Sequence, residues 1–354
     1  MSLSIVPDFT EVAPVIAAPK DLKEMLSVSK DEGGRTVVKI NSSSLSLIQT
    51  CARKSFYKLH QNLRAKTESP ALTAGKAIHK ALEIFYSHGS RERTMPVRFK
   101  ENVALQAYGQ LPQDVIDSHY FYSAVTEMMK VAEPLRALPE SDKRSIPNLA
   151  WLLTRYFEVY LLDPYVAHLD ADGKPYVERR FEFELYADQS LVVIVFGTID
   201  IVLRNEATNV LLPADHKTFS QAGNDFLNRI KPNHQYSAYL LGARNVLGIE
   251  TDEFMVNGFH IIAKPKTAAA KGAQHCRQIT KRNKHDLEVE FPQTILWAVR
   301  SYIFWCESQA FPLGDVNACS MYGACEFLDV CSAPLNLREN ILESKYNSPE
   351  APNG

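Results

Sequence analysis

Three cysteines recur near the end of the chain. Cys319, Cys325 and Cys331 each follow the previous one by six residues, and a fourth thiol, Cys51, lies far upstream in a chain with six cysteines in all. Thiolates bind zinc and iron–sulfur clusters, so these four predict a site that ties the C-terminal segment to the N-terminal region. Zinc and unpaired buried thiols remain open alternatives. Disulfides are the least favoured, because nothing else marks the chain as secreted.

A second group combines carboxylates with a lysine on neighbouring predicted strands. If the hairpin turn centres on residues 207–208, Asp200 lies opposite Asp215, with Cβ atoms about 5 Å apart. A similar register of the preceding strand adds Glu178. Lys217 shares a strand face with Asp215, because residues two apart point the same way. The sequence therefore predicts one patch that holds three carboxylates and a lysine.

Such a patch has a chemical meaning. Carboxylates this close repel one another unless a divalent cation holds them. A lysine beside the cation can orient a water molecule or stabilise the charge that develops on a phosphate. The alternative is a set of charged strand ends facing solvent, but Asp200 closes a run of apolar residues where solvation would be poor.

Two helical pairs could add to the patch. His79 and Glu83 are four residues apart and share a helix face, as do Gln235 and Tyr239 directly after the strand of Lys217. Taken alone, either pair has the spacing of any helix surface. Their significance depends on what surrounds them.

The elements that must position these residues follow from hydrophobic periodicity. After an irregular arm, a helix begins at Asn41 and carries Cys51. Periodicity changes from helical to alternating after residue 172, so the chain has a mixed α/β pattern. We expect helices over residues 41–56, 73–86, 90–170 (interrupted by prolines), after Pro232 and over 281–310, and strands over 177–185, 191–203, 209–217, 253–262 and 276–279.

Composition excludes several classes of protein. The 354 residues are 45% hydrophobic and 23% charged, with a mean hydropathy of −0.19, which is ordinary for a globular protein. No apolar stretch is long enough to span a bilayer, and the first residues lack the pattern of a signal peptide. We therefore expect a cytoplasmic protein without membrane contact. A net charge of −2 gives no global nucleic-acid footprint.

Six segments occur in an order that resembles the PD-(D/E)XK nuclease superfamily. The resemblance is to its RecB-like branch, which includes AddB-type recombination nucleases, CRISPR-associated adaptation exonucleases and many phage exonucleases. The matching segments are residues 44–57, 75–79, 197–200, 215–218 and 235–239, together with the terminal cysteines. They span about residues 41–335 and leave the arm and the helical stretch near 90–170 unmatched.

The resemblance implies a fold and a domain organisation. The fold is a restriction-endonuclease-like α/β core, in which helices flank a mixed central sheet, with a helical insertion and a C-terminal segment stapled by an iron–sulfur cluster. The implied organisation is a partly ordered arm over 1–40, a nuclease domain over 41–335 and a tail over 336–354. Within the nuclease domain, the insertion covers about 90–170 and the cysteine cluster about 319–331.

The resemblance also implies roles for individual residues. The metal ligands would be His79, Asp200, Asp215 and the backbone carbonyl of His216. Lys217 would be the catalytic lysine, Gln235 and Tyr239 would orient DNA, and Glu178 matches an acidic position of some relatives. A [4Fe–4S] cluster would be held by Cys51, Cys319, Cys325 and Cys331. Many relatives place the first two C-terminal cysteines two residues apart, whereas here the step is from 319 to 325. Cys276 and Cys306 fall outside the motif and are expected to be buried thiols.

The resulting functional hypothesis is a Mg²⁺- or Mn²⁺-dependent deoxyribonuclease. We expect an exonuclease that processes single- or double-stranded DNA ends in replication, recombination or repair, in a bacterial or phage-infected cell. The chain has no Walker motif, so a helicase or recombinase partner would be a separate protein. Residues 264–284 add a local DNA contact, because this run has seven basic residues and no acidic one.

Two other hypotheses compete with this one. A non-catalytic DNA-binding subunit that keeps the nuclease fold would be expected to have lost a metal ligand or the lysine, and all are present. A zinc-stapled module without a nuclease role leaves the patch of Asp200, Asp215 and Lys217 unexplained.

Overall fold

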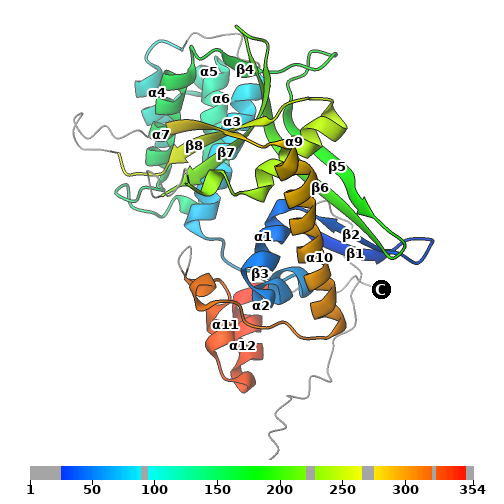
Figure 1. Ribbon diagram of the computed structural model, residues 1–354. Helices are drawn as coiled ribbons and strands as arrows, with labels where there is room; N and C mark the ends of the chain where they lie inside the picture. Colours follow the sequence, from blue (N-terminus) through cyan, green and yellow to red (C-terminus); the bar gives the residue numbers. More distant parts are fainter. Residues whose placement is uncertain (1–24, 89–94, 221–227, 265–274, 321–323, 348–354) are drawn as a thin grey trace, which may run out of the picture. The chain divides into compact units, whose positions relative to one another are not determined.

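The computed structural model describes residues 25–88, 95–220, 228–264, 275–320 and 324–347 (Figure 1). Residues 1–24 of the predicted arm and 348–354 of the predicted tail lie outside this range. The chain forms two compact units, each assembled from separate stretches of sequence. None of the helices in the described ranges combines the length and the apolar character needed to cross a membrane.

The unit that contains Glu68–Phe183 and Phe196–Glu288 is built on a mixed sheet. β6 pairs antiparallel with β4 and β7, β7 runs parallel to β8, and β8 pairs antiparallel with β9. β5, the strand that precedes β6 in the chain, also pairs with β6. The strands are β4 (Tyr165–Ala167), β5 (Val177–Ala187), β6 (Leu191–Asn205), β7 (Leu211–Phe219), β8 (Glu253–His260) and β9 (His275–Lys281). Residues 184–195, at the hairpin between β5 and β6, are counted with the other unit.

Helices of the same unit pack on this sheet and bury its apolar side chains (Figure 1). They confirm the predicted helical pattern around residues 90–170, which shares one hydrophobic core with strands β6, β7 and β8. The helices are α3 (Pro70–Ser87), α4 (Phe99–Ala107), α5 (Gln113–Asp117), α6 (Tyr120–Val131), α7 (Ile146–Tyr160) and α9 (His234–Leu247), with a 3₁₀ turn over Glu133–Leu135.

The start of α3 shows how sequence sets a helix boundary. Ser69 is the N-cap and its hydroxyl accepts the backbone N–H of Leu72 at 3.3 Å. Pro70 occupies the first turn, where its missing N–H costs nothing. Ala77, Ile78 and Ala81 then recur at helical spacing and are fully buried. This packing fixes α3 against the core.

The other unit combines residues 1–67, 184–195 and 289–354. Its strands β1 and β2 pair antiparallel, and β2 runs parallel to the first residues of β6, with Thr36 opposite Leu191. Helix α10 packs on α1. The elements are β1 (Leu26–Lys30), β2 (Thr36–Ile40), α1 (Ser42–Thr50), α2 (Ala52–Ser55), β3 (Arg64–Ala65), α10 (Phe291–Glu307), α11 (Leu328–Ser332), α12 (Leu335–Lys345) and β10 (Tyr346–Asn347), with a π-helical turn over Phe56–His60 and a 3₁₀ turn over Val316–Cys319.

One predicted helix is interrupted. Cys51 is not carried on a helix face, because it adopts an extended conformation with φ −165° and separates α1 from α2. The last long helix lies close to its predicted bounds, because helical residues from 284 and a π-helical turn over Asp286–Glu290 run directly into α10. Pro292 occupies the first turn of α10. Asn41 does cap α1, as predicted, by accepting the Ser44 N–H at 2.9 Å.

Candidate active site

The two strand aspartates lie across from each other, which confirms the predicted register. β6 and β7 pair Ile201 with Ala214, and the next pair in the same register is Asp200 with Asp215. Asp200 Oδ2 also accepts the backbone N–H of His216 at 2.8 Å. Asp215 is buried, with 1% of its surface exposed, and the Asp200 side chain is 12% exposed. The sheet thus holds two poorly solvated carboxylates together.

Helix α3 brings His79 to this pair. A side chain at Gly75 would place its Cβ only 3.1 Å from the Thr218 hydroxyl, so glycine permits the close approach of α3 to β7. One helical turn later, His79 Nδ1 lies 3.2 Å from Asp200 Oδ2. The predicted grouping of His79 with the aspartates therefore exists in space.

Lys217 contacts the second aspartate. Its Nζ lies 2.7 Å from Asp215 Oδ2, although that oxygen accepts no well-aligned hydrogen bond. Burial disfavours the ammonium form of Lys217, but the negative charges of Asp215 and Asp200 outweigh it and raise the pKa. Lys217 is therefore a permanent cation at neutral pH and partly neutralises the carboxylates.

Asp200 responds to the same crowding. Burial and the charge of Asp215 raise its pKa to about 6, while His79 and Lys217 act in the opposite direction. Two neighbouring carboxylates disfavour each other's ionisation, and a cation bound between them relieves this repulsion. This is the electrostatic arrangement that the sequence predicted.

Glu178 stands at the rim of the site. It has φ +50°, a left-handed conformation that is uncommon outside glycine, although the inside–outside alternation of β5 continues through it. The residue as a whole is exposed, so its carboxyl is only partly desolvated. That desolvation, followed by the charges of Asp200 and Glu83, raises its pKa to about 7.

Glu83 was noted in the sequence only as the helical neighbour of His79 and was given no role at the site. It forms an ion pair with Lys80 at 2.8 Å and lies close enough to Glu178 to raise the pKa of that residue. Its position four residues after His79 was the available signal, since residues at this spacing share a helix face.

Helix α9 supplies Gln235 and Tyr239. The Gln235 side-chain amide donates to the Tyr239 hydroxyl at 2.7 Å. Burial, followed by the charges of Asp215 and Asp200, raises the pKa of Tyr239 well above its usual value, so the phenol stays protonated beside the carboxylates. The predicted pair therefore exists and faces the site.

Two glycines explain the tight packing of α9. A Cβ at Gly242 would lie 2.4 Å from the Phe181 ring, and one at Gly197 would lie 2.7 Å from the same ring. Phe181 is thus wedged between β6 and α9, and only glycine fits on either side.

The side chain of His216 belongs to a buried polar network instead of the carboxylate patch. Its Nδ1 lies 2.9 Å from the Asn257 amide nitrogen, which also contacts the Tyr156 hydroxyl at 2.7 Å. Burial lowers the pKa of His216 well below its usual value. Arg277 completes the network by pairing with Asp163. The sequence analysis did not recognise this network, whose polar residues lie on otherwise apolar strands.

The expected basic DNA contact is wrong at Arg277 and Arg282, which point inward, whereas Lys264, Lys281 and Lys284 are exposed and leave that part of the contact a prediction. Arg277 is nearly buried in the network above, and Arg282 is 5% exposed and donates to the Ser237 hydroxyl. Lys281 and Lys284 pair with Glu253 and Glu288. Lys266 and Lys271 lie outside the described residues. A run of positive charge in sequence does not say which side chains point inward.

The donors at the carboxylate site suit a hard divalent cation. One imidazole and two carboxylates are ligands that Mg²⁺ and Mn²⁺ accept, and Asp215 offers a buried oxygen without a well-aligned hydrogen bond. Within the described ranges, however, no three His, Cys, Asp or Glu side chains form a preassembled metal site. His79 and Lys217 occupy the two carboxylates with contacts of their own.

The predicted thiol group lies in the other unit. Burial raises the pKa of Cys331, Arg53 opposes the shift, and Cys325 and Cys51 raise it further, so these thiols lie within electrostatic reach of one another. The Cys319 carbonyl accepts the Cys325 N–H at 2.8 Å. All six cysteines are free thiols. Cys276 and Cys306, expected to be buried, are only half-buried.

Direct contacts dock the cysteine segment on the N-terminal region. Lys58 pairs with Glu326 at 2.7 Å, and Arg53 Nε donates to the Phe311 carbonyl at 2.8 Å. The Gly314 N–H points at Cys51 Sγ, 3.3 Å away. Beside these contacts lies a small core of five buried side chains: Tyr57, Leu63, Phe327, Val330 and Tyr346.

Comparison with known proteins agrees with this geometry. No curated protein sequence matches the chain. The family model of the PD-(D/E)XK nuclease superfamily matches residues 39–332, a range that contains the mixed sheet, the carboxylate site and all four motif cysteines. Members of this superfamily are generally nucleases. The chain belongs to the PD-(D/E)XK nuclease superfamily.

Proposed function

We propose that the protein is a Mg²⁺- or Mn²⁺-dependent deoxyribonuclease that hydrolyses phosphodiester bonds at DNA ends. The observation that carries the proposal is the pair of opposed, poorly solvated aspartates, with His79 3.2 Å from one and Lys217 2.7 Å from the other. A lone aspartate on a buried strand is costly, and two together make sense where a cation joins them. An exonuclease acting with a separate helicase or recombinase is the form of this activity that we favour.

In this mechanism the side chains of the site would position a divalent cation and the DNA phosphate. Asp200, Asp215, His79 and the His216 carbonyl would hold a divalent cation, which supplies an activated water and offsets charge on the phosphate. Lys217, kept protonated by its neighbours, donates a hydrogen bond to the scissile phosphate group. Gln235 and Tyr239, already paired, orient the DNA strand.

The decisive experiment removes the lysine. Lys217→Ala and Asp215→Asn should each lower the rate of cleavage of end-labelled DNA by about 10²–10⁴-fold in the presence of Mn²⁺. Lys281→Ala is the matched control, because Lys281 is an exposed lysine of the same unit. Circular dichroism checks that all variants are folded. Native cleavage rates in a folded Lys217→Ala protein would refute the mechanism.

We also propose that Cys51, Cys319, Cys325 and Cys331 hold a structural [4Fe–4S] cluster. The mutual influence of Cys331, Cys325 and Cys51, and the Gly314 N–H aimed at Cys51 Sγ, support the thiol set. Amide hydrogen bonds to sulfur are part of how proteins stabilise such clusters. The segment around Cys319 also belongs to the same compact unit as Cys51.

Metal analysis tests the cluster. Protein purified without oxygen should be brown and contain about four irons per chain. Cys51→Ser should lose iron, whereas Cys276→Ser, a half-buried cysteine outside the set, should retain it. Stoichiometric zinc without iron would replace the cluster with a zinc site.

A further inference from the structure

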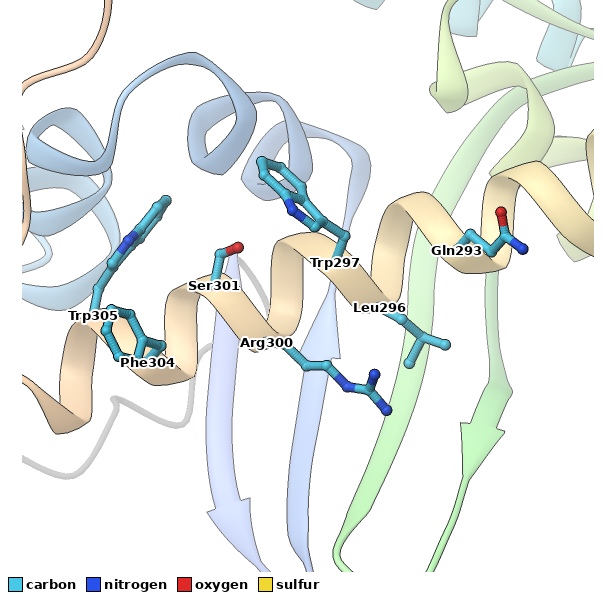
Figure 2. Close-up of a pocket in the computed structure, with 7 residues that line it drawn as sticks. All are labelled: Gln293, Leu296, Trp297, Arg300, Ser301, Phe304 and Trp305. Atoms are coloured by element: carbon cyan, nitrogen blue, oxygen red, sulfur yellow. The ribbon is translucent and has the colours of Figure 1, made fainter.

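Helix α10 carries an exposed aromatic groove that the proposed catalysis does not use. Its volume is about 470 Å³. Figure 2 shows the side chains that line it, and all of them come from α10 itself. Trp297 is 59% exposed and Phe304 is 63% exposed, which is unusual for such large apolar side chains.

The groove runs between two rows of side chains. Residues four apart stack along one side of a helix, so each row forms a ridge. In Figure 2 the two rows project from different sides of α10. The first row is Gln293, Trp297, Ser301 and Trp305, and the second is Leu296, Arg300 and Phe304.

Trp297 and Phe304 lie outside the hydrophobic core. The opposite side of α10 already supplies the core contacts, since Ile295, Ala298 and Val299 are almost completely buried. The exposed part of each ring gains nothing from the hydrophobic effect, because only area removed from water contributes to stability. Rings kept on the surface beside a groove are therefore typical of a binding surface.

The charge of the groove favours an anionic occupant. Arg300 is the charged residue among those that line it, and none of these is acidic. The Arg300 side chain also interacts with Tyr186, whose hydroxyl donates to Asp188 at 2.7 Å. Asp188 is in turn held by the backbone N–H groups of Ser190 and Leu191, at 2.7 and 2.8 Å.

We propose that this groove binds single-stranded DNA, with bases stacked on Trp297 and Phe304 and Arg300 contacting a phosphate. The proposal rests on the nuclease function and narrows its substrate to a strand with accessible bases. The two rings are seven residues apart, or about 10 Å along the helix axis, so they can hold separate bases. A duplex hides its base faces and cannot use the groove in this way.

A protein partner fits the groove less well. Stable protein interfaces use about 20–30 residues on each side, far more than the seven that line this surface. Aromatic rings interleaved with an arginine are instead the recurrent composition of single-strand platforms, where stacking is tolerant of sequence.

The first test measures binding without cleavage. A fluorescein-labelled oligothymidylate and a hairpin duplex are titrated by anisotropy against full-length protein in EDTA. Trp297→Ala and Phe304→Ala should each weaken oligothymidylate binding about 5–150-fold, the range for losing one stacked base. Trp297→Phe should restore most of the affinity because it keeps a ring. Leu335→Ala, which removes a 77% exposed leucine elsewhere in the same unit, should change nothing.

Arg300 provides an independent measurement. Arg300→Gln should reduce the slope of log K against log salt by about 0.7 for the single strand, as expected for one lost phosphate contact. Trp297→Ala should leave this slope unchanged because it removes stacking alone.

The outcomes separate this proposal from the nuclease function. Unchanged oligothymidylate affinity in Trp297→Ala and Phe304→Ala overturns the groove, whatever Lys217→Ala does to cleavage. Equal losses for the oligothymidylate and the duplex also overturn it. If Trp297→Ala and Phe304→Ala leave DNA affinity intact but change the oligomeric state of the protein, the surface is a protein contact instead. Conversely, stacking losses in a protein that never cleaves DNA would uphold the groove and refute the nuclease.

Discussion

Ionisable side chains in this protein are controlled by their immediate neighbours. Lys217 keeps its proton because two carboxylates outweigh its burial, and the pKa of Asp200 is raised by its burial and by the charge of Asp215 opposite. Neither state follows from residue type alone. The Lys217 cation offsets part of the negative charge of the carboxylate pair, which eases the approach of a polyanionic substrate.

His275 shows the same principle without a charged partner. Its ring lies among Phe259, Tyr156 and Tyr160, and both of its buried ring nitrogens lack a well-aligned hydrogen bond. Burial therefore lowers the pKa of His275 to about 3. The folded protein holds this histidine neutral over the whole physiological range.

Acid should consequently weaken the fold through His275. Above pH 6.5 the ring is neutral in both states and its stability contribution is complete. Below that pH the unfolded chain takes up a proton that the folded chain refuses, until pH approaches 3. At pH 5 the loss is about 2 kcal/mol. We expect His275→Phe to remove this part of the pH dependence, as measured by urea unfolding between pH 7 and 5.

A second histidine provides the control. His88 is exposed, so His88→Phe should retain the pH dependence of the native protein. If His275→Phe and the native protein lose stability in parallel as the pH falls, then His275 titrates normally and the prediction is wrong.

At the scale of elements, the back of the carboxylate strand is held by a buried network. β7 and β8 run in parallel with His216 opposite Asn257, and β8 and β9 set Asn257 opposite Arg277. The Arg277 guanidinium lies 3.9 Å from the centre of the Tyr160 ring and pairs with Asp163. Three strands and helix α7 are thus joined behind Asp215 and Lys217.

Breaking this network should be costly. Arg277→Met leaves the Asp163 carboxylate poorly solvated and without its ion-pair partner, for which we expect a loss of about 3–5 kcal/mol in the free energy of unfolding. The pKa of Arg277 is raised despite burial, because Tyr156, Tyr86 and Asp163 all favour the cation. Urea titration monitored by circular dichroism measures the loss.

The matched control lies on the same strand. Lys281 pairs with Glu253 at 2.5 Å but is 67% exposed, so Lys281→Met should cost less than about 1 kcal/mol. Equal effects of the two substitutions would show that the Arg277 pair is as weak as a surface ion pair.

The network also marks the limit of what could be predicted from sequence. The register of Asp200 and Asp215 followed from a local turn and strand alternation, both short-range rules. Arg277 and Arg282 were placed at the surface by their charge, yet tertiary partners far away in sequence make them buried. Asn257 was missed for the same reason, because the sequence around a single polar residue in an apolar strand does not identify its distant hydrogen-bond partners. The sequence identified Cys51 as a candidate ligand, but it did not predict that the backbone of Cys51 is extended.

At the scale of the whole molecule, the two chemistries belong to different units. The carboxylate site with α3, β6, β7 and α9 lies in one unit, and the cysteines with α10 and the C-terminal helices lie in the other. Both units are discontinuous in sequence, so each closes long loops of chain. Closing such loops is entropically unfavourable, and a cluster that joins Cys51 to residues 319–331 would offset that cost.

The cluster should therefore stabilise its own unit and leave the catalytic unit folded. In Cys331→Ser, we expect faster amide hydrogen exchange in residues 311–320, 324–345 and 52–65, because the small core of Tyr57 and Phe327 and the Lys58–Glu326 pair would have to hold the segment alone. Exchange in α3, β7 and β8 should not change. Cys306→Ser, a half-buried cysteine of the same unit outside the set, should match the native protein. Identical exchange in Cys331→Ser and native protein would show that side-chain contacts suffice to dock the segment. If exchange in β7 rose equally, the cysteines would instead support the fold as a whole.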